Sequence, residues 1–325
     1  MSKAIRIHAH GGPEVLAWEE ADPGKPGAGE VLVRHTAIGL NFIDVYYRTG
    51  LYPAPGGLPL VPGGEGAGVV EEVGPDVQGL KVGDRVAYAV GIGAYAERRV
   101  IAADRLVKVP DGVSDEQAAA MMLKGMTAEY LLRRTYRVKA GDTILFHAAA
   151  GGVGLIAGQW AKHLGAATIG TAGSAEKVGL AKAHGYDYVI NYREQDFVAE
   201  VARITGGKKC EVVYDSVGKD TFEGSLDCLK PLGLLALFGQ SSGPVPPFNL
   251  GVLSQKGSLY ITRPTLFVYV AKREDLEASA KALFDVVQKG VVQIQINQRY
   301  ELKDAAKAQA DLEARRTTGT TILVP

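Results

Sequence analysis

AAGGVG, at residues 149–154, is the stretch of the sequence that decides the fold. Ala149, Gly151 and Gly154 occupy the three small-residue positions of the A-x-G-x-x-G form of the dinucleotide fingerprint. The first small residue permits a tight turn, the second lets the backbone approach a pyrophosphate, and the third lets helix and strand pack closely. The N-terminus of the helix that follows offers unpaired N–H groups and the positive end of a dipole to an anion.

The flanks of this stretch complete a strand–helix–strand unit. An apolar run at 143–146 precedes it, a helix-like run at 155–164 follows, and a second strand-like run covers 167–171. The whole spans about 30 residues, the usual size of a βαβ unit. Glycine-rich turns are common, so a merely structural turn is the alternative, but the flanking elements favour nucleotide binding.

Composition narrows the class of protein. A length of 325 residues suggests two domains. The formal net charge is zero and no long basic run occurs, which counts against a nucleic-acid or membrane-surface role. The N-terminus lacks a signal-peptide pattern and no apolar run reaches about 18 residues, so we expect a cytoplasmic protein without a membrane span. Cys210 and Cys228 are too few for a disulfide framework and are expected to be thiols.

Two patterns follow each other along the chain. Up to about residue 110, short β-like runs separated by Gly and Pro indicate a compact, partly open barrel. These runs lie at 4–7, 30–38, 68–73, 84–89 and 95–101. Ser114 and Gln117 then form the capping box that opens a helix.

From residue 143 strands and helices alternate, which predicts a parallel sheet covered on both faces. The strands are expected at 143–146, 167–171, 188–191, 211–215 and 233–238, and the helices at 152–165, 174–184, 195–205 and 219–229. After about residue 265 come helices at 273–289 and 303–315 and a strand at 320–324. These elements are too few for a separate core, so we expect them to return to the N-terminal domain.

The residues beyond the glycines favour NADPH over NADH. An NAD site usually places an acid about 20 residues beyond the glycines, on the ribose 2′-hydroxyl, but residues 170–174 read GTAGS. Ser174, Lys177 and Tyr192 can each donate a hydrogen bond to a 2′-phosphate. The alternative is that Lys177 is a solvated helix residue and that Tyr192 caps a strand.

Several segments, in their order and spacing, resemble the medium-chain dehydrogenase/reductases. They are GLNFID at 39–44, VPGGEGAG at 61–68, GDRV at 83–86, HAAAGGVG at 147–154 and YDSVG at 214–218. The resemblance covers essentially the whole chain. Within the superfamily, the chain is most similar to the zinc-free, zeta-crystallin-like quinone oxidoreductases. LKGMTA at 123–128 and FGQSSG at 238–243 resemble bacterial NADPH:quinone reductases closely.

This resemblance implies an α/β fold with two domains. A GroES-like, partly open β-barrel catalytic domain would comprise 1–124 and a return segment, 266–325. A Rossmann domain with a doubly wound parallel sheet, at 125–265, would bind NADPH. The chain would be a homodimer that reduces a small quinone or activated alkene, with no nucleic-acid or membrane partner. The β-prone run at 257–262 can pair with its mate at the edge of the nucleotide sheet.

No metal is expected. The zinc alcohol dehydrogenases carry Cys where this chain has Asn41, and His where it has Gly64, and neither residue is a normal zinc ligand. Their four-Cys structural lobe is also missing, because no Cys precedes Cys210. Without a Lewis acid, alcohol oxidation loses its usual means of alkoxide formation. Quinones and activated alkenes are therefore the expected acceptors.

The resemblance also implies the site residues. Asn41, Phe42 and Tyr46 would lie near the nicotinamide, with Tyr52 at the rim; Asn41, Tyr46 and Tyr52 are the candidates for contact with the acceptor. The alternative makes Phe42, Tyr46 and Tyr47 core residues of a short helix that Asn41 caps. Further cofactor contacts are expected at Gly151, Gly152 and Val153 for the pyrophosphate, Gly173, Ser174, Lys177, Tyr192 and Arg315 for the 2′-phosphate, and Ser216, Phe238, Gly239, Ser241 and Leu266. Arg315 can instead be a helix C-terminal cation, and Lys124 and Thr127 receive no role.

Three functions are compatible with these residues. The first is NADPH-dependent, zinc-independent reduction of quinones, by hydride or by single electrons. The second is an NADPH-dependent 2-alkenal or enoyl-thioester reductase. The third is a non-catalytic NADPH-binding structural or RNA-binding protein, which the crystallin kinship allows. The neutral charge and the lack of an aromatic-basic stripe count against RNA.

Overall fold

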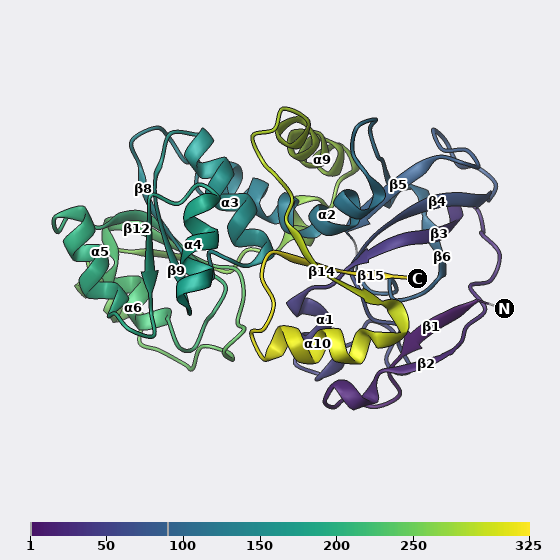
Figure 1. The fold of residues 1–325 in the computed structure, drawn as a ribbon, viewed down its shortest axis with the longest axis horizontal. Coiled ribbons are helices and arrows are strands. Elements are labelled where there is room, and N and C mark those ends of the chain that lie inside the picture. The colour runs from purple at the N-terminus through teal and green to yellow at the C-terminus, as the bar shows by residue number, and fades with distance from the viewer. Residues whose placement is uncertain (1, 90) are drawn as a thin grey trace. The chain divides into compact units, whose positions relative to one another are not determined.

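A computed structural model describes residues 2–89 and 91–325 (Figure 1). The chain divides into two compact units. We call the first the terminal unit, because it holds both chain ends: Met1–Met126, Val270–Gln288 and Ile294–Pro325. The central unit comprises Thr127–Tyr269 and Lys289–Gln293. The prediction of an α/β fold with a GroES-like barrel and a Rossmann-type parallel sheet is confirmed.

The terminal unit is built on a seven-stranded sheet in the order β14-β15-β3-β4-β5-β7, in which β6 also pairs with β3. Its strands are β3 (Glu30–Gly39), β4 (Glu65–Val73), β5 (Arg85–Ala89), β6 (Arg98–Ala102), β7 (Val107–Lys108), β14 (Ile296–Glu301) and β15 (Thr320–Val324). The last strand pairs antiparallel with β3, where Ile322 lies opposite Gly39. A separate hairpin joins β1 (Lys3–Arg6) and β2 (Ala17–Glu20).

The core of this unit forms where the alternating side chains of the strands meet the helices. Ile5, Val33, Ile38 and Leu323 are all fully buried in it, and burial of each such side chain contributes roughly 1.5–3 kcal/mol. The helices are α1 (Phe42–Arg48), α2 (Asp115–Tyr130), α9 (Arg273–Gln288) and α10 (Ala305–Glu313), with 3-10 turns at Pro13–Val15, Ala103–Arg105 and Leu302–Asp304. Helix α2 continues into the central unit and ends in a π-helical turn, Leu131–Thr135.

The central unit contains a six-stranded, fully parallel sheet in the order β10-β9-β8-β11-β12-β13. Its strands are β8 (Thr143–Phe146), β9 (Ala167–Ala172), β10 (Tyr188–Asn191), β11 (Cys210–Asp215), β12 (Leu229–Leu237) and β13 (Tyr260–Thr262). The helices are α3 (Gly152–His163), α4 (Ala175–Ala183), α5 (Phe197–Thr205), α6 (Phe222–Asp227), α7 (Gly251–Gln255) and α8 (Leu266–Tyr269). The strand order reverses between β8 and β11, and doubly wound sheets bind ligands at the carboxyl ends of strands at such a point.

Most expected elements occur, with shifted ends. The capping box is formed, since the Gln117 amide donates to Ser114 Oγ at 3.1 Å and the Ser114 amide donates to Gln117 Oε1 at 3.0 Å. The strand expected at 95–101 begins only at Arg98. Its first residue leaves the ladder because the Tyr95 amide donates to the Pro62 carbonyl, and the Tyr95 carbonyl accepts from the Ile5 amide. Across residues 2–89 and 91–325, no helix combines the length and apolar character needed to cross a membrane.

Candidate functional site

The glycine-rich turn leads from β8 into α3. Ala148 adopts a left-handed φ of 55°, and the Gly151 amide donates to its carbonyl at 2.9 Å. A Cβ on Gly154 would lie 2.5 Å from that same carbonyl oxygen, so a side chain there would push the helix off the turn. The N-cap, Gly151, offers no side chain to the first amides of α3. The N–H groups of Gly152 and Val153, in the first turn, have no partner within the helix and can bind a phosphate.

Four expected cofactor residues come together where β11 and β12 end. The Phe238 amide donates to the Asp215 carbonyl at 2.8 Å, and the Ser241 amide donates to the Ser216 carbonyl at 3.1 Å. A Cβ on Gly239 would lie 2.6 Å from the Ser216 carbonyl oxygen. The loops that follow β11 and β12 are therefore in contact at the carboxyl edge of the sheet. Position 239 requires glycine because the two backbones approach closely there.

A buried polar network beneath these loops was not anticipated from the sequence. His147 shares hydrogen bonds of 3.0 Å with the hydroxyls of Thr171 and Ser225, and Ser225 donates to Asp215 at 2.9 Å. Asp215 also accepts from the Gly218 amide at 3.1 Å. Burial lowers the pKa of His147, so its ring stays neutral and can accept as well as donate. The sequence signal that could have indicated this network is the presence of polar residues directly after β8 and at the end of β11.

The residues expected at the 2′-phosphate also lie close to one another. The Tyr192 hydroxyl packs on Gly173, since a Cβ there would lie 2.5 Å from it. Ser174 caps α4, accepting from the Lys177 amide at 3.3 Å, and its own proton stays available to an acceptor. Lys177 lies one turn into the helix and is half-buried, whereas the nearby acid, Glu176, is exposed. This donor set and the glycine cradle fit an adenosine carrying a 2′-phosphate.

In the terminal unit, Asn41 is the N-cap of α1, and its amide donates to Asp44 Oδ2 at 2.9 Å. Tyr46 is buried, with its ring centroid 5.2 Å from that of Tyr52 and 6.4 Å from that of Phe42. The alternative of a short helix with Asn41 as its cap therefore describes the local structure. Contact of Asn41, Tyr46 and Tyr52 with an acceptor stays a prediction.

A buried charged cluster adjoins Asn41, and the sequence analysis did not assign it. Glu65 is fully buried; its Oε2 accepts from Lys124 Nζ at 2.7 Å and from Asn41 Nδ2 at 2.8 Å, and its Oε1 accepts from the Leu123 amide at 2.7 Å. Burial raises the pKa of Asp44 to about 7, and its Oδ1 has no hydrogen-bond partner among the described residues. Glu65 and Lys124 both stand in the segments that carried the resemblance, 61–68 and 123–128.

This cluster does not fit a zinc ion. Gly64 has no side chain, and Asn41 directs its amide hydrogens to Glu65. The carboxylate of Glu65 is already neutralised by the ammonium of Lys124, which a metal cation would have to displace. Within the described part of the chain, no three His, Cys, Asp or Glu residues are grouped so as to hold a metal ion.

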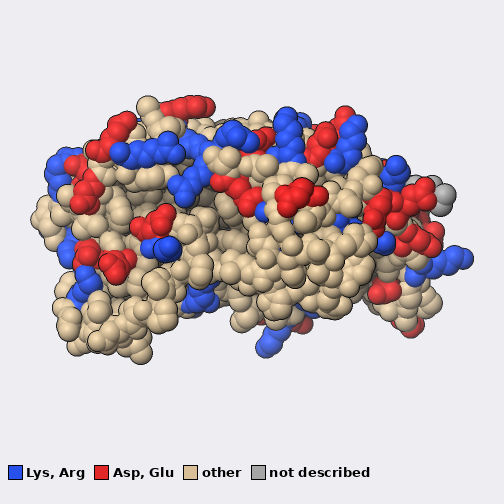
Figure 2. All heavy atoms as spheres, turned by 90° about the horizontal axis from the view of Figure 1, so that it is seen from below, with Lys and Arg blue, Asp and Glu red and all other residues tan. Residues whose placement is uncertain are grey.

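Two expected cofactor residues remain, Arg315 in the terminal unit and Leu266 in the central unit. Arg315 is exposed, with a left-handed φ of 58°, just beyond α10. Leu266 is buried at the start of α8. Red and blue side chains are interspersed in Figure 2, mainly in its upper part, and neither sign forms a field of its own.

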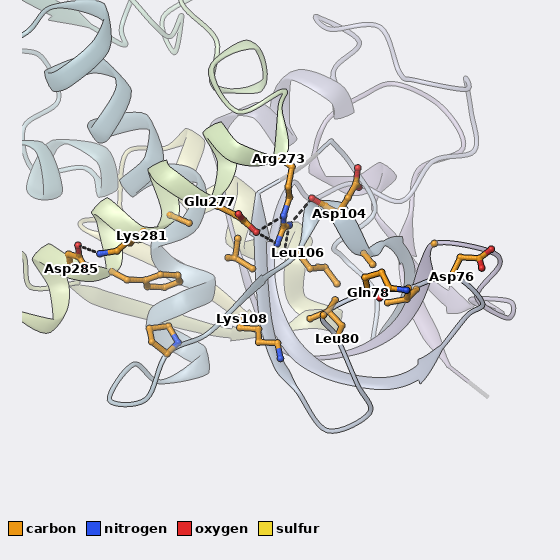
Figure 3. A pocket seen from close by; sticks show the side chains of 18 of the residues that line it. Asp76, Gln78, Leu80, Asp104, Leu106, Lys108, Arg273, Glu277, Lys281 and Asp285 are labelled. Atoms are coloured by element: carbon orange, nitrogen blue, oxygen red, sulfur yellow. Dashed lines mark hydrogen bonds and ion pairs between the residues drawn. The ribbon is translucent and has the colours of Figure 1, made fainter.

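A groove of about 780 Å³ opens in the terminal unit between α9 and the loop that holds Gln78 and Leu80 (Figure 3). Two ion pairs lie within its lining, Arg273 with Glu277 at 2.7 Å and Lys281 with Asp285 at 2.6 Å. Arg273 also donates to the Leu106 carbonyl at 2.6 Å. None of the expected site residues lines this groove.

Comparison with known proteins gives the family. Residues 27–111 match the alcohol dehydrogenase GroES-like domain, and residues 152–283 match the zinc-binding dehydrogenase family. A quinone oxidoreductase of Pseudomonas aeruginosa is 59% identical over the full length of both chains. The chain belongs to the quinone oxidoreductases of the medium-chain dehydrogenase/reductase superfamily.

Two further proteins are similar to this quinone oxidoreductase over nearly its whole length. The crystal structure of Escherichia coli quinone oxidoreductase complexed with NADPH has a TM-score of 0.97 and 52% identity, covering 99% of this chain and all of that one. A 2-haloacrylate reductase of a Burkholderia species is 47% identical, covering 100% of this chain and 99% of the relative.

Proposed function

We propose that this quinone oxidoreductase transfers electrons from NADPH to a quinone without using a metal ion. The observation that carries the cofactor assignment is the donor set of Ser174, Lys177 and Tyr192 around Gly173, in which the usual ribose-binding acid is missing. The full-length similarity to quinone oxidoreductases, one of them solved with NADPH, supports both halves of the proposal. The zinc-incompatible cluster at Glu65 supports metal independence.

One set of residues would bind the cofactor, and a second set would position the acceptor. The first-turn amides of α3, from Gly152 and Val153, would hold the pyrophosphate, and Lys177 with its neighbours would hold the 2′-phosphate. When bound, NADPH supplies the reducing electrons. We assign Asn41, Tyr46 and Tyr52 to the acceptor. The two tyrosine rings are tilted by 55°, so a flat quinone would stack on the face of one ring and contact the edge of the other. Contacts from Ser216, Phe238, Gly239, Ser241, Leu266 and Arg315 complete the proposed cofactor set.

Reduction of activated alkenes is the second candidate. It is favoured by the 47% identity to a 2-haloacrylate reductase, whose name describes an alkene conjugated to a carboxyl group. Quinones and such alkenes both take up negative charge on an oxygen conjugated to the reduced carbon. One binding surface can therefore serve both classes.

An acceptor panel tests the proposal. The rate of NADPH oxidation is expected to be highest with benzoquinone or naphthoquinone, lower with acrolein and crotonyl thioester, and lower again when NADH replaces NADPH. Dialysis against a chelator is expected to leave these rates unchanged, with elemental analysis as its control. Faster turnover of the alkenes would establish the second candidate, and a failure to oxidise NADPH with any of these acceptors would favour a non-catalytic role.

We further propose a homodimer that forms through the outer edge of the central sheet. Strand β13 lies at that edge, and its Tyr260 is 61% exposed. An uncovered edge strand offers unpaired backbone groups to a second copy. Light scattering at micromolar concentration should give twice the chain mass, and Tyr260→Asp should shift it toward the monomer. A monomeric wild type contradicts this assembly.

A further inference from the structure

We propose that Lys124 is a catalytic residue of acceptor reduction. Its ammonium group, fixed by Glu65, donates a hydrogen bond to the acceptor oxygen on which negative charge develops. This inference rests on the proposed function, since it concerns the same acceptor.

The hydrogen bonding of Lys124 is incomplete within the protein. An ammonium group has three N–H donors, and among the residues described here Lys124 Nζ has a single acceptor, Glu65 Oε2, at 2.7 Å. Its side chain is only 7% exposed, so water can solvate little of it. A buried cation with unused donors is costly unless something else accepts from them. A bound acceptor oxygen meets that need.

The position of Lys124 is coupled to that of Asn41. Both side chains donate to the same oxygen of Glu65, at 2.7 Å and 2.8 Å. Glu65 is itself fixed, since it begins β4, is fully buried, and its other oxygen accepts from the Leu123 amide. The ammonium and the Asn41 amide therefore lie side by side on a rigid carboxylate. Donors that are positioned before charge develops need no reorganisation during the reaction.

This arrangement supplies the electrostatic help that a metal gives in related enzymes. Gly64 and Asn41 provide no metal ligands, yet a positive charge stands beside them. In the two-electron case, the quinone gains one hydride while NADPH becomes NADP⁺, and the hydroquinone anion takes one proton from solvent. Lys124 keeps its protons throughout and stabilises the negative oxygen. An α,β-unsaturated carbonyl compound would use the same contact, through its enolate oxygen.

The test uses a double variant, Glu65→Gln with Lys124→Met. Lys124→Met alone would leave a buried carboxylate unpaired and threaten the fold, whereas the double variant removes both charges and keeps the volumes similar. We expect it to bind NADPH within twofold of wild type, and its kcat for naphthoquinone to fall on the order of 10²–10³-fold, as when an oxyanion donor is removed. Lys124→Arg, which keeps a charged donor, should retain more activity.

The matched control is Glu211→Gln with Lys230→Met, which removes a pair of the same chemistry at 2.6 Å in the central unit. It should leave kcat unchanged. A Glu65→Gln/Lys124→Met protein that turns over like wild type would show that the pair is only structural. If wild type itself fails to reduce quinones, the proposed function falls instead, so the two failures are distinguishable.

A second measurement needs no stable variant. The phenolate of 4-nitrophenol resembles a hydroquinone that has lost one proton, and the absorption spectrum distinguishes this phenolate from the neutral phenol. Wild type saturated with NADP⁺ should bind it as the phenolate and lower its apparent pKa by about one unit, equivalent to a tenfold preference for the anion. Binding as the neutral phenol, or no binding, contradicts a role for Lys124 at the acceptor oxygen.

Discussion

Replacement of Lys177 by Ala is expected to weaken NADPH binding on the order of tenfold to a hundredfold and to leave NADH binding nearly unchanged. A charge-assisted hydrogen bond contributes roughly 1.5–3 kcal/mol, and about 1.4 kcal/mol corresponds to tenfold in affinity. NADH lacks the 2′-phosphate, so removal of the ammonium group takes no phosphate contact away from it. Titration of protein fluorescence with each cofactor measures the two dissociation constants.

Tyr192→Phe is the matched variant for this experiment. It removes one neutral donor next to Gly173 and keeps the ring, so it should weaken NADPH less than Lys177→Ala does. A parallel fall in NADPH and NADH affinity for Lys177→Ala would mean that Lys177 supports the fold or the adenine pocket. The assignment of the 2′-phosphate would then be wrong.

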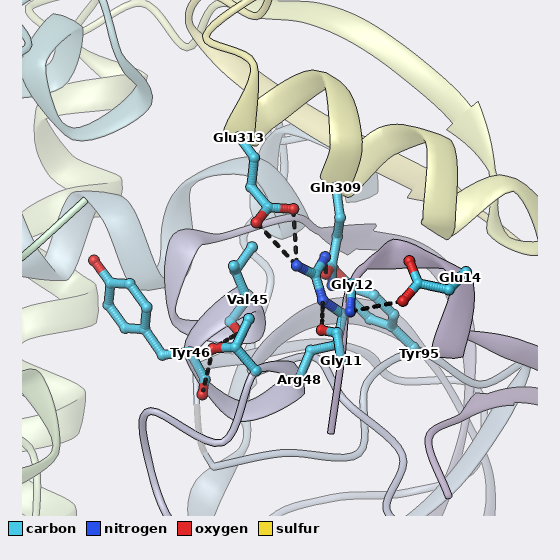
Figure 4. A network of polar contacts seen from close by, with 10 residues as sticks. Gly11, Gly12, Glu14, Val45, Tyr46, Arg48, Tyr95, Gln309 and Glu313 are labelled. Carbon is cyan, nitrogen blue, oxygen red and sulfur yellow. Dashed lines mark hydrogen bonds and ion pairs between the residues drawn. The ribbon is translucent and has the colours of Figure 1, made fainter. Parts of the chain in front are cut away.

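Arg48→Met is expected to destabilise the terminal unit by about 3 kcal/mol, near the lower limit for breaking a buried ion pair. Arg48 is 1% exposed and links α1 to the C-terminal helix α10 (Figure 4). It donates to Gln309 at 2.7 Å, to both carboxylate oxygens of Glu313 at 2.9 Å, and to the Gly11 carbonyl at 3.1 Å. Methionine fills similar space but leaves the buried Gln309 oxygen unpaired. The lower limit applies because Glu313 is one-third exposed and water can take over part of its solvation.

Urea unfolding followed by circular dichroism measures this loss as a lower midpoint. Arg316→Met is the control, because the Arg316 side chain is 64% exposed and its pair with Asp311 lies in the same C-terminal stretch. An exposed pair contributes at most about 1 kcal/mol. Equal shifts for the two variants would contradict the importance of burial at Arg48.

The local pattern was enough to predict the fold class and most elements. Strand β8 (Thr143–Phe146) has the expected bounds, and the Ser114–Gln117 capping box forms as expected. Both follow from short-range rules, in which apolar runs and capping residues act within a few positions. Tyr95 shows the limit, because its backbone partners, Pro62 and Ile5, come from distant turns that no local pattern indicates.

The residues of the candidate site also fall into a group that the local sequence predicts and a group that depends on long-range contacts. The glycine turn and the donors around Gly173 are sequence-local, so their residue types could be assigned directly, although their contacts with a cofactor stay predictions. The Glu65–Lys124 pair joins residues 59 positions apart, and His147 meets Ser225 across 78. In both cases the sequence shows a polar residue in or next to a recognisable motif. Its partner cannot be predicted, because the two residues come together only in the folded chain.

Because β15 pairs with β3, the sheet of the terminal unit cannot fold in the order in which its strands are synthesised. Residues 30–39 are synthesised long before Ile322 and Leu323, the fully buried residues of β15 that pair with the end of β3. The central unit can meanwhile fold as soon as its own strands are available. Until β15 is made, Ile38 and Gly39 at the end of β3 expose unpaired backbone groups, whereas residues 30–34 can already pair with β6. Such unpaired groups are a template for mispairing during synthesis.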